Sequence, residues 1–237
     1  MIIDVHSHIL PGIDDGAQDW DTSMQMLVQS SKEGVQKVVA TPHYYPWRAN
    51  APVDTIRLLC QEAMERLRAD YDIDMDIYPG QEVLYGMGVL EDLKAGKILT
   101  LADSRYVLVE FMPDETFSVL YHAVRELMSA GYIPVLAHVE RYDCLQQMDN
   151  FHSLKAGGAL FQMNASAVSG GILSRKSRWS KKILKAGLID YIASDMHNLT
   201  SRGPCTKEKI ELIQKVLESE YLEKLLYVNP GKILEDV

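Results

Sequence analysis

Histidine and acidic side chains recur where strand-like runs of this sequence end. Imidazole and carboxylate groups without a neighbouring cysteine are typical ligands of manganese, iron or zinc in catalytic sites. They are too many for one ion, so we expect two or three ions, with a carboxylate such as Glu82 bridging them. The candidate ligands are His6, His8, Asp15, His43, Glu82, Glu110, His138, Asp195 and His197.

The first two histidines, His6 and His8, lie two positions apart on a predicted strand. Side chains on a strand alternate between its faces, so both imidazoles point the same way and Ser7 faces away. The loop that follows contains Asp14 and Asp15, and the sequence leaves open which of them is a ligand. Clustered ions lower the pKa of a shared water and hold phosphoryl oxygens. The pattern therefore predicts a multinuclear metal hydrolase.

Strand-like runs alternate with helical patterns along the whole chain. The strand-like runs are 2–5, 35–40, 75–78, 106–111, 133–137, 159–163 and 191–193. The helical patterns lie near 20–33, 53–69, 115–130, 143–156, 175–186 and 204–226, and Gly34, Gly131 and Gly187 follow three of them as predicted C-terminal caps. This alternation predicts one α/β domain over 1–237 with parallel strands. Ligands at six or more strand ends favour a barrel over an open sheet.

Composition excludes several classes of protein. No apolar run reaches the roughly 18 residues of a membrane span, and the N-terminus lacks the basic and apolar regions of a signal peptide. We therefore expect a cytoplasmic protein without membrane insertion. The net charge of -9 argues against nucleic-acid binding. Cys60, Cys144 and Cys205 are odd in number and far apart, which argues against a disulfide framework.

Residues 6–16, His-Ser-His-Ile-Leu-Pro-Gly-Ile-Asp-Asp-Gly, resemble the opening of the polymerase-and-histidinol-phosphatase (PHP) superfamily. More narrowly, they resemble its CpsB/CapC branch of bacterial manganese-dependent protein tyrosine phosphatases. Segments 40–44, 80–83, 136–142 and 194–198 are similar to the later motifs of that branch, in order, so the match runs from residue 1 to about residue 205. The resemblance implies a distorted seven-stranded (β/α) barrel with three ions. Mn²⁺ is the expected metal, with iron or zinc as alternatives.

The resemblance also implies roles for individual residues. One ion would be held by His6, His8, Glu82 and Asp195, a second by Glu82, Glu110 and His138, and a third by Asp15, His43 and His197. Reasoning from the residues alone agrees on this set but does not assign it to individual ions. Arg141 and Arg202 would contact phosphate, because a guanidinium matches phosphate oxygens in a planar fork. The implied substrate is a phosphotyrosyl protein, namely the tail of a bacterial tyrosine autokinase of capsule or exopolysaccharide synthesis.

Other functions fit less well. A small-molecule phosphatase, such as one for histidinol phosphate, or another phosphoesterase would use the same barrel. An amidohydrolase is disfavoured by the two additional glutamates and the third metal site, and an inactive scaffold is disfavoured because every candidate ligand is present. Cys60 and Arg66 have the spacing of a cysteine-dependent phosphatase loop, but the residues between them are strong helix formers.

One helical pattern is strongly basic. It carries Arg175, Lys176, Arg178, Lys181, Lys182 and Lys185. A solvated helix face is the default interpretation, and a face that receives an acidic or phosphorylated partner is the alternative.

Overall fold

The structure, a computed structural model, describes residues 1–169, 174–204 and 207–236. Its strands pair in parallel and form two hydrogen-bonded sheets. The three-stranded sheet has the order β1 (Ile2–Ser7), β2 (Val35–Ala40) and β4 (Asp76–Pro79). The six-stranded sheet has the order β3 (His43–Tyr44), β5 (Glu82–Leu84), β6 (Tyr106–Glu110), β7 (Ile133–Leu136), β8 (Leu160–Asn164) and β9 (Tyr191–Ala193).

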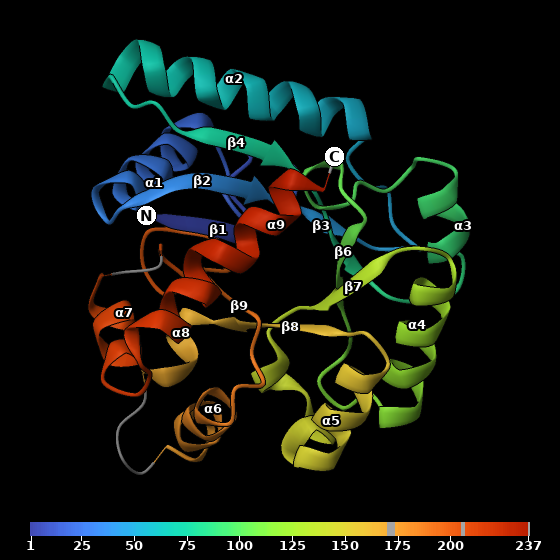
Figure 1. Ribbon diagram of the computed structural model, residues 1–237. Coiled ribbons are helices and arrows are strands. Elements are labelled where there is room, and N and C mark those ends of the chain that lie inside the picture. Colours follow the sequence, from blue (N-terminus) through green and yellow to red (C-terminus); the bar gives the residue numbers. More distant parts are fainter. Residues whose placement is uncertain (170–173, 205–206, 237) are drawn as a thin grey trace.

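The two sheets meet where β1 passes the end of β9. Ser7 and Met196 form a parallel bridge, the Asp195 N–H donates to the His6 carbonyl at 2.9 Å, and the His8 N–H donates to the Met196 carbonyl at 2.9 Å. The parallel strands thus curl around one centre (Figure 1). The predicted α/β alternation with parallel strands is confirmed. The short strands β3 and β5 were not expected.

Helices cover the outside of the curled sheet (Figure 1). They are α1 (Trp20–Lys32), α2 (Val53–Tyr71), α3 (Val89–Lys94), α4 (Phe117–Ser129), α5 (Met148–Ala156), α6 (Arg175–Lys185), α7 (Lys207–Gln214), α8 (Ser219–Glu223) and α9 (Asn229–Glu235). Short 3-10 segments are η1 (Leu101–Asp103), η2 (Val139–Arg141), η3 (Asp143–Gln146) and η4 (Ala165–Val168), and η5 (Lys224–Val228) is a π-helical segment. No helix in these described ranges is long and apolar enough to cross a membrane.

Three expectations about the helices need correction. Helix α3 was not expected, and the pattern near 143–156 begins with η3 before α5 starts at Met148. The pattern near 204–226 divides into α7, α8 and η5, and helical structure continues through α9 to Glu235. The three predicted glycine caps are confirmed, because Gly34, Gly131 and Gly187 have φ of 95°, 91° and 69°. Glycine adopts these left-handed angles without the steric cost of a Cβ atom.

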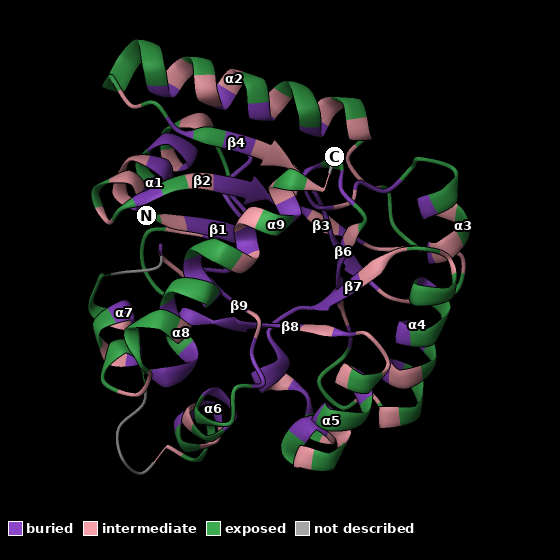
Figure 2. Cartoon of the chain, viewed as in Figure 1, coloured by how far each residue is buried: buried purple, intermediate pink, exposed green. Residues whose placement is uncertain are grey.

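Strands β1, β5, β7, β8 and β9 are buried along nearly all of their length, which is why they are mostly apolar runs, whereas Gln36 of β2 and Asp76 of β4 are exposed. Figure 2 shows the buried strands and the exposed outer faces of the helices. Val5, Val39, Leu108 and Val135 belong to one buried cluster formed by neighbouring strands. Two larger clusters pack the helices against the sheets. This packing holds the strand ends in fixed positions, and the side chains that follow them can therefore form a rigid site.

Candidate metal centre

All the candidate ligands meet in one cluster, and most of them lie at or after the carboxyl end of a parallel strand. His43 and Glu82 instead begin β3 and β5, just after β2 and β4 end. The ring centroids of His6 and His8 lie 5.3 Å apart, those of His8 and His43 4.5 Å apart, and those of His8 and His197 3.8 Å apart. The His138 ring lies 5.7 Å from that of His6. The predicted imidazoles therefore form one cluster, and the predicted carboxylates lie between them.

One group of ligand atoms consists of two imidazole nitrogens and two carboxylate oxygens. His6 Nε2 and His8 Nε2 face each other at 3.2 Å. Glu82 Oε2 lies 3.1 Å from each of them, and Asp195 Oδ1 lies 3.5 and 3.6 Å away. The four side chains can each offer one atom within 4.8 Å of the others. Ser7 faces away, as expected, and its hydroxyl donates to the Val39 carbonyl at 2.9 Å.

Glu82 lies between this group and a second one. His43 Nδ1 is 3.2 Å from Glu82 Oε2 and 3.2 Å from Glu110 Oε1. The other Glu82 oxygen, Oε1, is 2.7 Å from His138 Nε2, which lies 3.5 Å from Glu110 Oε2. The Glu82 carboxylate therefore contacts histidines on both sides, which is the geometry of a bridging ligand.

The third group lies at the solvent side of the cluster. His43 Nε2 and His197 Nε2 lie 3.3 and 3.5 Å from Asp15 Oδ1. The Asp15 side chain is 63% exposed, whereas that of His197 is 2% exposed. Asp14 has a different position, because its Oδ2 accepts from His8 Nδ1 at 2.8 Å and from the His43 N–H at 3.2 Å. Asp15 thus faces the other candidate ligands, and Asp14 orients His8.

Two amide side chains on β8 form hydrogen bonds with the candidate ligands. Gln162 Oε1 lies 3.1 Å from His6 Nδ1 and accepts from the His138 N–H at 2.6 Å. Asn164 Nδ2 donates to Asp195 Oδ2 at 2.7 Å, and Gln162 Nε2 donates to Asn164 Oδ1 at 2.9 Å. Such bonds hold the ring of a ligand and select its tautomer. Sequence reasoning missed both residues. Their only signal is two amides two positions apart at a strand end.

The electrostatics of the cluster match a site for cations. Burial opposes charge on His8, yet Asp14 and Glu82 raise its pKa to about 9. Burial likewise opposes charge on His43, but Asp15 and Glu110 raise its pKa to about 11. The Glu82 carboxyl would be neutralised by burial, but His6, together with His138 and His8, holds its pKa well below the usual range. Without a metal, protons must balance these carboxylates. Divalent ions would serve the same purpose.

Unpaired nitrogens also fit a metal. Among the described residues, the buried ring nitrogens His43 Nδ1, His138 Nδ1 and His197 Nε2 make no well-aligned hydrogen bond, although His43 Nδ1 lies 3.2 Å from carboxylate oxygens and His197 Nε2 lies 3.5 Å from one. Leaving a buried polar atom unpaired costs about 1–3 kcal/mol, and coordination would satisfy it. The candidate ligands His138 and Asp195 also have positive φ values of 35° and 51°. Such left-handed conformations cost on the order of 1–3 kcal/mol in residues with a Cβ atom and are concentrated at functional sites.

The two predicted phosphate-binding arginines border the cluster. Arg141 Nη2 donates to Asp195 Oδ2 at 2.5 Å, and Arg202 Nη2 donates to Asp195 Oδ1 at 2.9 Å. Arg202 Nη1 also lies 3.8 Å from Asp15 Oδ2. Their side chains are 32% and 37% exposed, so solvent reaches both guanidinium groups. Burial favours neutral Asp195, but His6 and Arg141 keep the pKa of that carboxyl below its usual range despite neighbouring Glu82.

The cysteine-and-arginine spacing lies on a helix, as the helix formers predicted. Cys60 is buried in α2, and burial raises its pKa to about 12. Arg66 lies over the Trp20 ring at 4.4 Å and pairs with Glu62 at 2.7 Å. A neutral buried thiol is a poor nucleophile. Cys205 lies outside the described residues.

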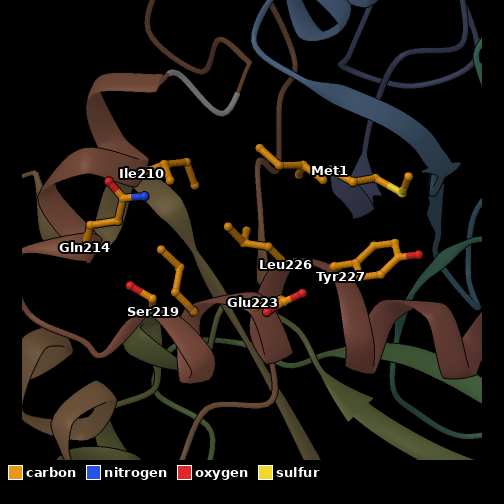
Figure 3. A pocket seen from close by; sticks show the side chains of 9 residues that line it. Met1, Ile210, Gln214, Ser219, Glu223, Leu226 and Tyr227 are labelled. Carbon is orange, nitrogen blue, oxygen red and sulfur yellow. The ribbon is translucent and has the colours of Figure 1, made fainter.

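A cavity of about 500 Å³ lies away from the metal centre. Figure 3 shows Met1, Ile210, Leu226 and Tyr227 around it. Ile2, at the beginning of β1, also lines it, whereas His6 lies near the end of the same strand. The cavity is therefore separated from the cluster by the length of β1.

Comparisons with known proteins agree with this geometry. The family model described as "Capsular polysaccharide synthesis, CpsB/CapC" matches residues 2–235. The tyrosine-protein phosphatase CpsB of Streptococcus pneumoniae is 32% identical over 99% of this chain and 99% of its own length. The tyrosine-protein phosphatase YwqE of Bacillus subtilis is 32% identical over 99% of this chain and 92% of its own length.

Solved structures give the same result. A structure from a study of YwqE from B. subtilis and CpsB from S. pneumoniae, described as unique metal-dependent tyrosine phosphatases, is 30% identical. It superposes with a TM-score of 0.91 over 99% of this chain and 95% of that chain. A β-aspartyl dipeptidase of Fervidobacterium islandicum has a TM-score of 0.61 over 98% of this chain and 72% of that chain, at 12% identity, and shares the fold alone.

Proposed function

The chain belongs to the CpsB/CapC family of capsular polysaccharide synthesis, and we propose that it is a metal-dependent protein tyrosine phosphatase. The observation that carries this proposal is the convergence of buried imidazole and carboxylate ligands around Glu82, with a helical and neutral Cys60. Phosphate ester hydrolysis without a nucleophilic thiol requires another nucleophile, and a metal-activated water can serve as one.

We further propose that the chain is one domain over 1–237 with the shape of a distorted seven-stranded barrel. Strands β2 and β3 are separated by two residues, and so are β4 and β5, so each pair can be counted as one interrupted strand. The hydrogen bonds between β1 and the end of β9 support closure on the other side.

The site is proposed to hold three ions, with Mn²⁺ as the first candidate and iron or zinc as alternatives. The mixture of imidazole and carboxylate ligands supports these metals. The proposed sets are His6, His8, Glu82 and Asp195; Glu82, Glu110 and His138; and Asp15, His43 and His197. His43 also approaches Glu82 and Glu110, so its imidazole lies between two of the sets.

When bound, such ions supply an activated water and neutralise charge on phosphoryl oxygens. The chain itself would position the substrate. Arg141 and Arg202 each keep N–H donors beyond those used on Asp195, and these can bind the phosphoryl oxygens. The Tyr45 ring stacks on His43 with a centroid distance of 5.1 Å, which places an aromatic face where a substrate tyrosine ring can pack.

The proposed substrate is a phosphotyrosyl protein, specifically the tail of a bacterial tyrosine kinase of capsule or exopolysaccharide synthesis. The names of the relatives support phosphotyrosine as the substrate group. The cytoplasmic location stays a prediction.

The decisive assay compares a phosphotyrosyl peptide with histidinol phosphate at equal metal loading. Exhaustive EDTA treatment should abolish hydrolysis, Mn²⁺ should restore it, and kcat/KM should be higher for the peptide. Full activity of the metal-free protein would contradict the metal proposal. A higher kcat/KM for histidinol phosphate would instead support the small-molecule alternative.

The number of ions has its own test. His197→Ala should lose about one of the three proposed ions per chain, because His197 is one of the three proposed ligands of the third ion. The free energy of unfolding should change little. Metal analysis of the folded variant measures this directly. Unchanged stoichiometry with unchanged activity would remove His197 from the site.

A further inference from the structure

We propose that the surface between η2, η3 and the basic helix α6 binds acidic residues that flank the phosphotyrosine of the substrate. This inference rests on the proposed phosphatase function and deepens it, because it assigns the part of the protein that reads the sequence around the phosphate. We call this surface the basic groove. It is lined by Arg141, Gln146, Arg175, Lys176, Arg178 and Lys182.

The charge of α6 is the first observation. Six of the chain's 24 lysines and arginines lie on this helix of 11 residues, which has no acidic residue, although the whole chain has a net charge of -9. Within the ranges that the structure describes, none of these six cations forms an ion pair, and five of them are exposed. Several surface cations elsewhere do have partners, such as Arg57 with Asp103 and Arg105 with Asp236. The charge on α6 is therefore available to an external anion.

The continuity of the groove with the metal centre is the second observation. A hollow of about 580 Å³ is lined by Arg141 together with Arg175 and Lys176 of α6. A second hollow, of about 300 Å³, continues along α6 between Gln146, Arg178 and Lys182. Arg175 and Gln146 line both hollows, so they adjoin. Because Arg141 contacts Asp195 of the metal centre, the groove begins where the phosphate would be bound.

A third hollow branches toward the interior. It measures about 190 Å³ and is lined by Glu140, Arg141, Asn164 and Lys176, among others. Asn164, whose side chain donates to Asp195, lines this hollow, so the hollow also connects α6 with the candidate ligands. Helix α6 therefore borders the site through two hollows, which share Arg141 and Lys176.

The dimensions of the groove suit a short peptide segment. Arg175, Arg178 and Lys182 are spaced by three and four residues, so they lie on one face of the helix. From Arg175 to Lys182 the helix rises about 10 Å, a distance that an extended chain covers in about three residues. Asp143 and Glu140 also line the first hollow, but the cations outnumber them. A peptide with several acidic residues on one side of its phosphotyrosine is therefore the complementary ligand.

The experiment compares three phosphotyrosyl peptides of equal length with the Mn²⁺-loaded protein. One carries three glutamates before the phosphotyrosine, one carries three after it, and one has glutamine at all six positions. The variant Arg178→Glu/Lys182→Glu changes the groove. The control variant, Lys181→Glu/Lys185→Glu, changes the net charge of α6 by the same amount as the groove variant, but its two positions do not line the groove.

We expect the parent to have a lower KM for one glutamate peptide than for the glutamine peptide. The groove variant should raise that KM by roughly tenfold, because two attractive surface pairs become repulsive, and high salt should weaken the effect. Its kcat/KM for p-nitrophenyl phosphate should stay parental, since the small substrate does not reach α6. The control variant should change KM for the peptide by less than about twofold, because Lys181 and Lys185 do not line the groove and their charges are partly screened by salt.

Three results would overturn the proposal. Equal KM values for all peptides in the parent would show that the groove does not read acidic flanks. Equal effects of the two double variants would show a general charge effect. If the parent binds phosphatidylglycerol vesicles and the groove variant does not, while the peptide KM of the groove variant is unchanged, α6 would be assigned to a membrane surface. Failure of the parent to hydrolyse p-nitrophenyl phosphate and every peptide would instead refute the phosphatase function itself, and the groove as a substrate site with it.

Discussion

Gln162→Met should weaken metal binding, although Gln162 is not itself a proposed ligand. Gln162 is buried, and its Oε1 accepts from the ring of His6 at 3.1 Å and from the backbone N–H of His138 at 2.6 Å. Methionine is similar in length but accepts hydrogen bonds poorly. Both donors would then be buried without a strong acceptor. Asn164 Oδ1 would also lose the hydrogen bond that it accepts from Gln162 Nε2 at 2.9 Å.

The expected magnitudes follow from these contacts. Each unsatisfied buried donor costs about 1–3 kcal/mol, so the free energy of unfolding of the metal-free protein should fall by roughly 2–6 kcal/mol. Loss of a residue that orients a metal ligand typically lowers affinity 10- to 100-fold, which corresponds to about 1.4–2.7 kcal/mol. Urea unfolding in the presence of a chelator measures the first quantity, and calorimetric titration with Mn²⁺ measures the second.

Ser104→Ala is the matched control. Its hydroxyl donates to the Leu101 carbonyl at 2.6 Å and accepts from the Tyr106 N–H at 3.1 Å, so the variant also loses a buried acceptor. Ser104 precedes β6, whereas Glu110 lies at the end of that strand. The control should lose stability and keep its Mn²⁺ affinity. Parental Mn²⁺ affinity in folded Gln162→Met would refute the reasoning, and so would an equal loss of affinity in the control.

Three further predictions follow from the charges of the site and its surroundings. Because the pKa values of His8 and His138 are raised to about 9 in the metal-free protein, their protonation stabilises it fully below the unfolded-state value of about 6.5, and this stabilisation is lost as pH rises through 9. The free energy of unfolding measured with chelator should therefore fall between pH 6.5 and 9. Over the same range the apparent Mn²⁺ affinity should rise, because fewer protons are displaced. A free energy from urea unfolding that rises with pH, or an affinity from Mn²⁺ titration that falls with pH, would contradict this. Cys60→Ser should keep parental kcat, since the thiol is buried and neutral, and a folded but inactive variant in a p-nitrophenyl phosphate assay would show that the thiol acts. Arg141→Ala and Arg202→Ala should each lower the rate on the order of a hundredfold with near-parental metal content, and parental turnover by both would remove the phosphate role.

The sequence was sufficient to predict the residue types and the class of site. His6 and His8 share a face because a strand has a period of two, and this holds for any arrangement of the other strands. The glycine caps after helices are equally local, as the positive φ of Gly34 and Gly131 shows. The alternation of strands and helices is also a local pattern, and it correctly predicted a parallel α/β fold.

The sequence did not predict the shortest strands, and it did not distinguish between two adjacent candidate ligands. Strands β3 and β5 contain two and three residues, too few for a periodic pattern. Asp14 and Asp15 have the same chemistry and adjacent positions, so only the path of the loop separates them. That path depends on Gly16, where a Cβ atom would lie 2.1 Å from the His8 carbonyl oxygen.

Tertiary packing alone decided which groups meet. Gln162 is 156 residues from His6 in the chain, yet it receives the hydrogen bond that orients the ring. Asp195, which follows β9, lies beside Arg141 only because β7 and β9 end at the same edge of the sheet. Periodicity and residue type describe a few neighbouring positions, whereas these distances depend on strand order and on how the helices pack. The sequence therefore predicted which residue types gather at the candidate site, and the folded structure determined which of them meet and which partners they have.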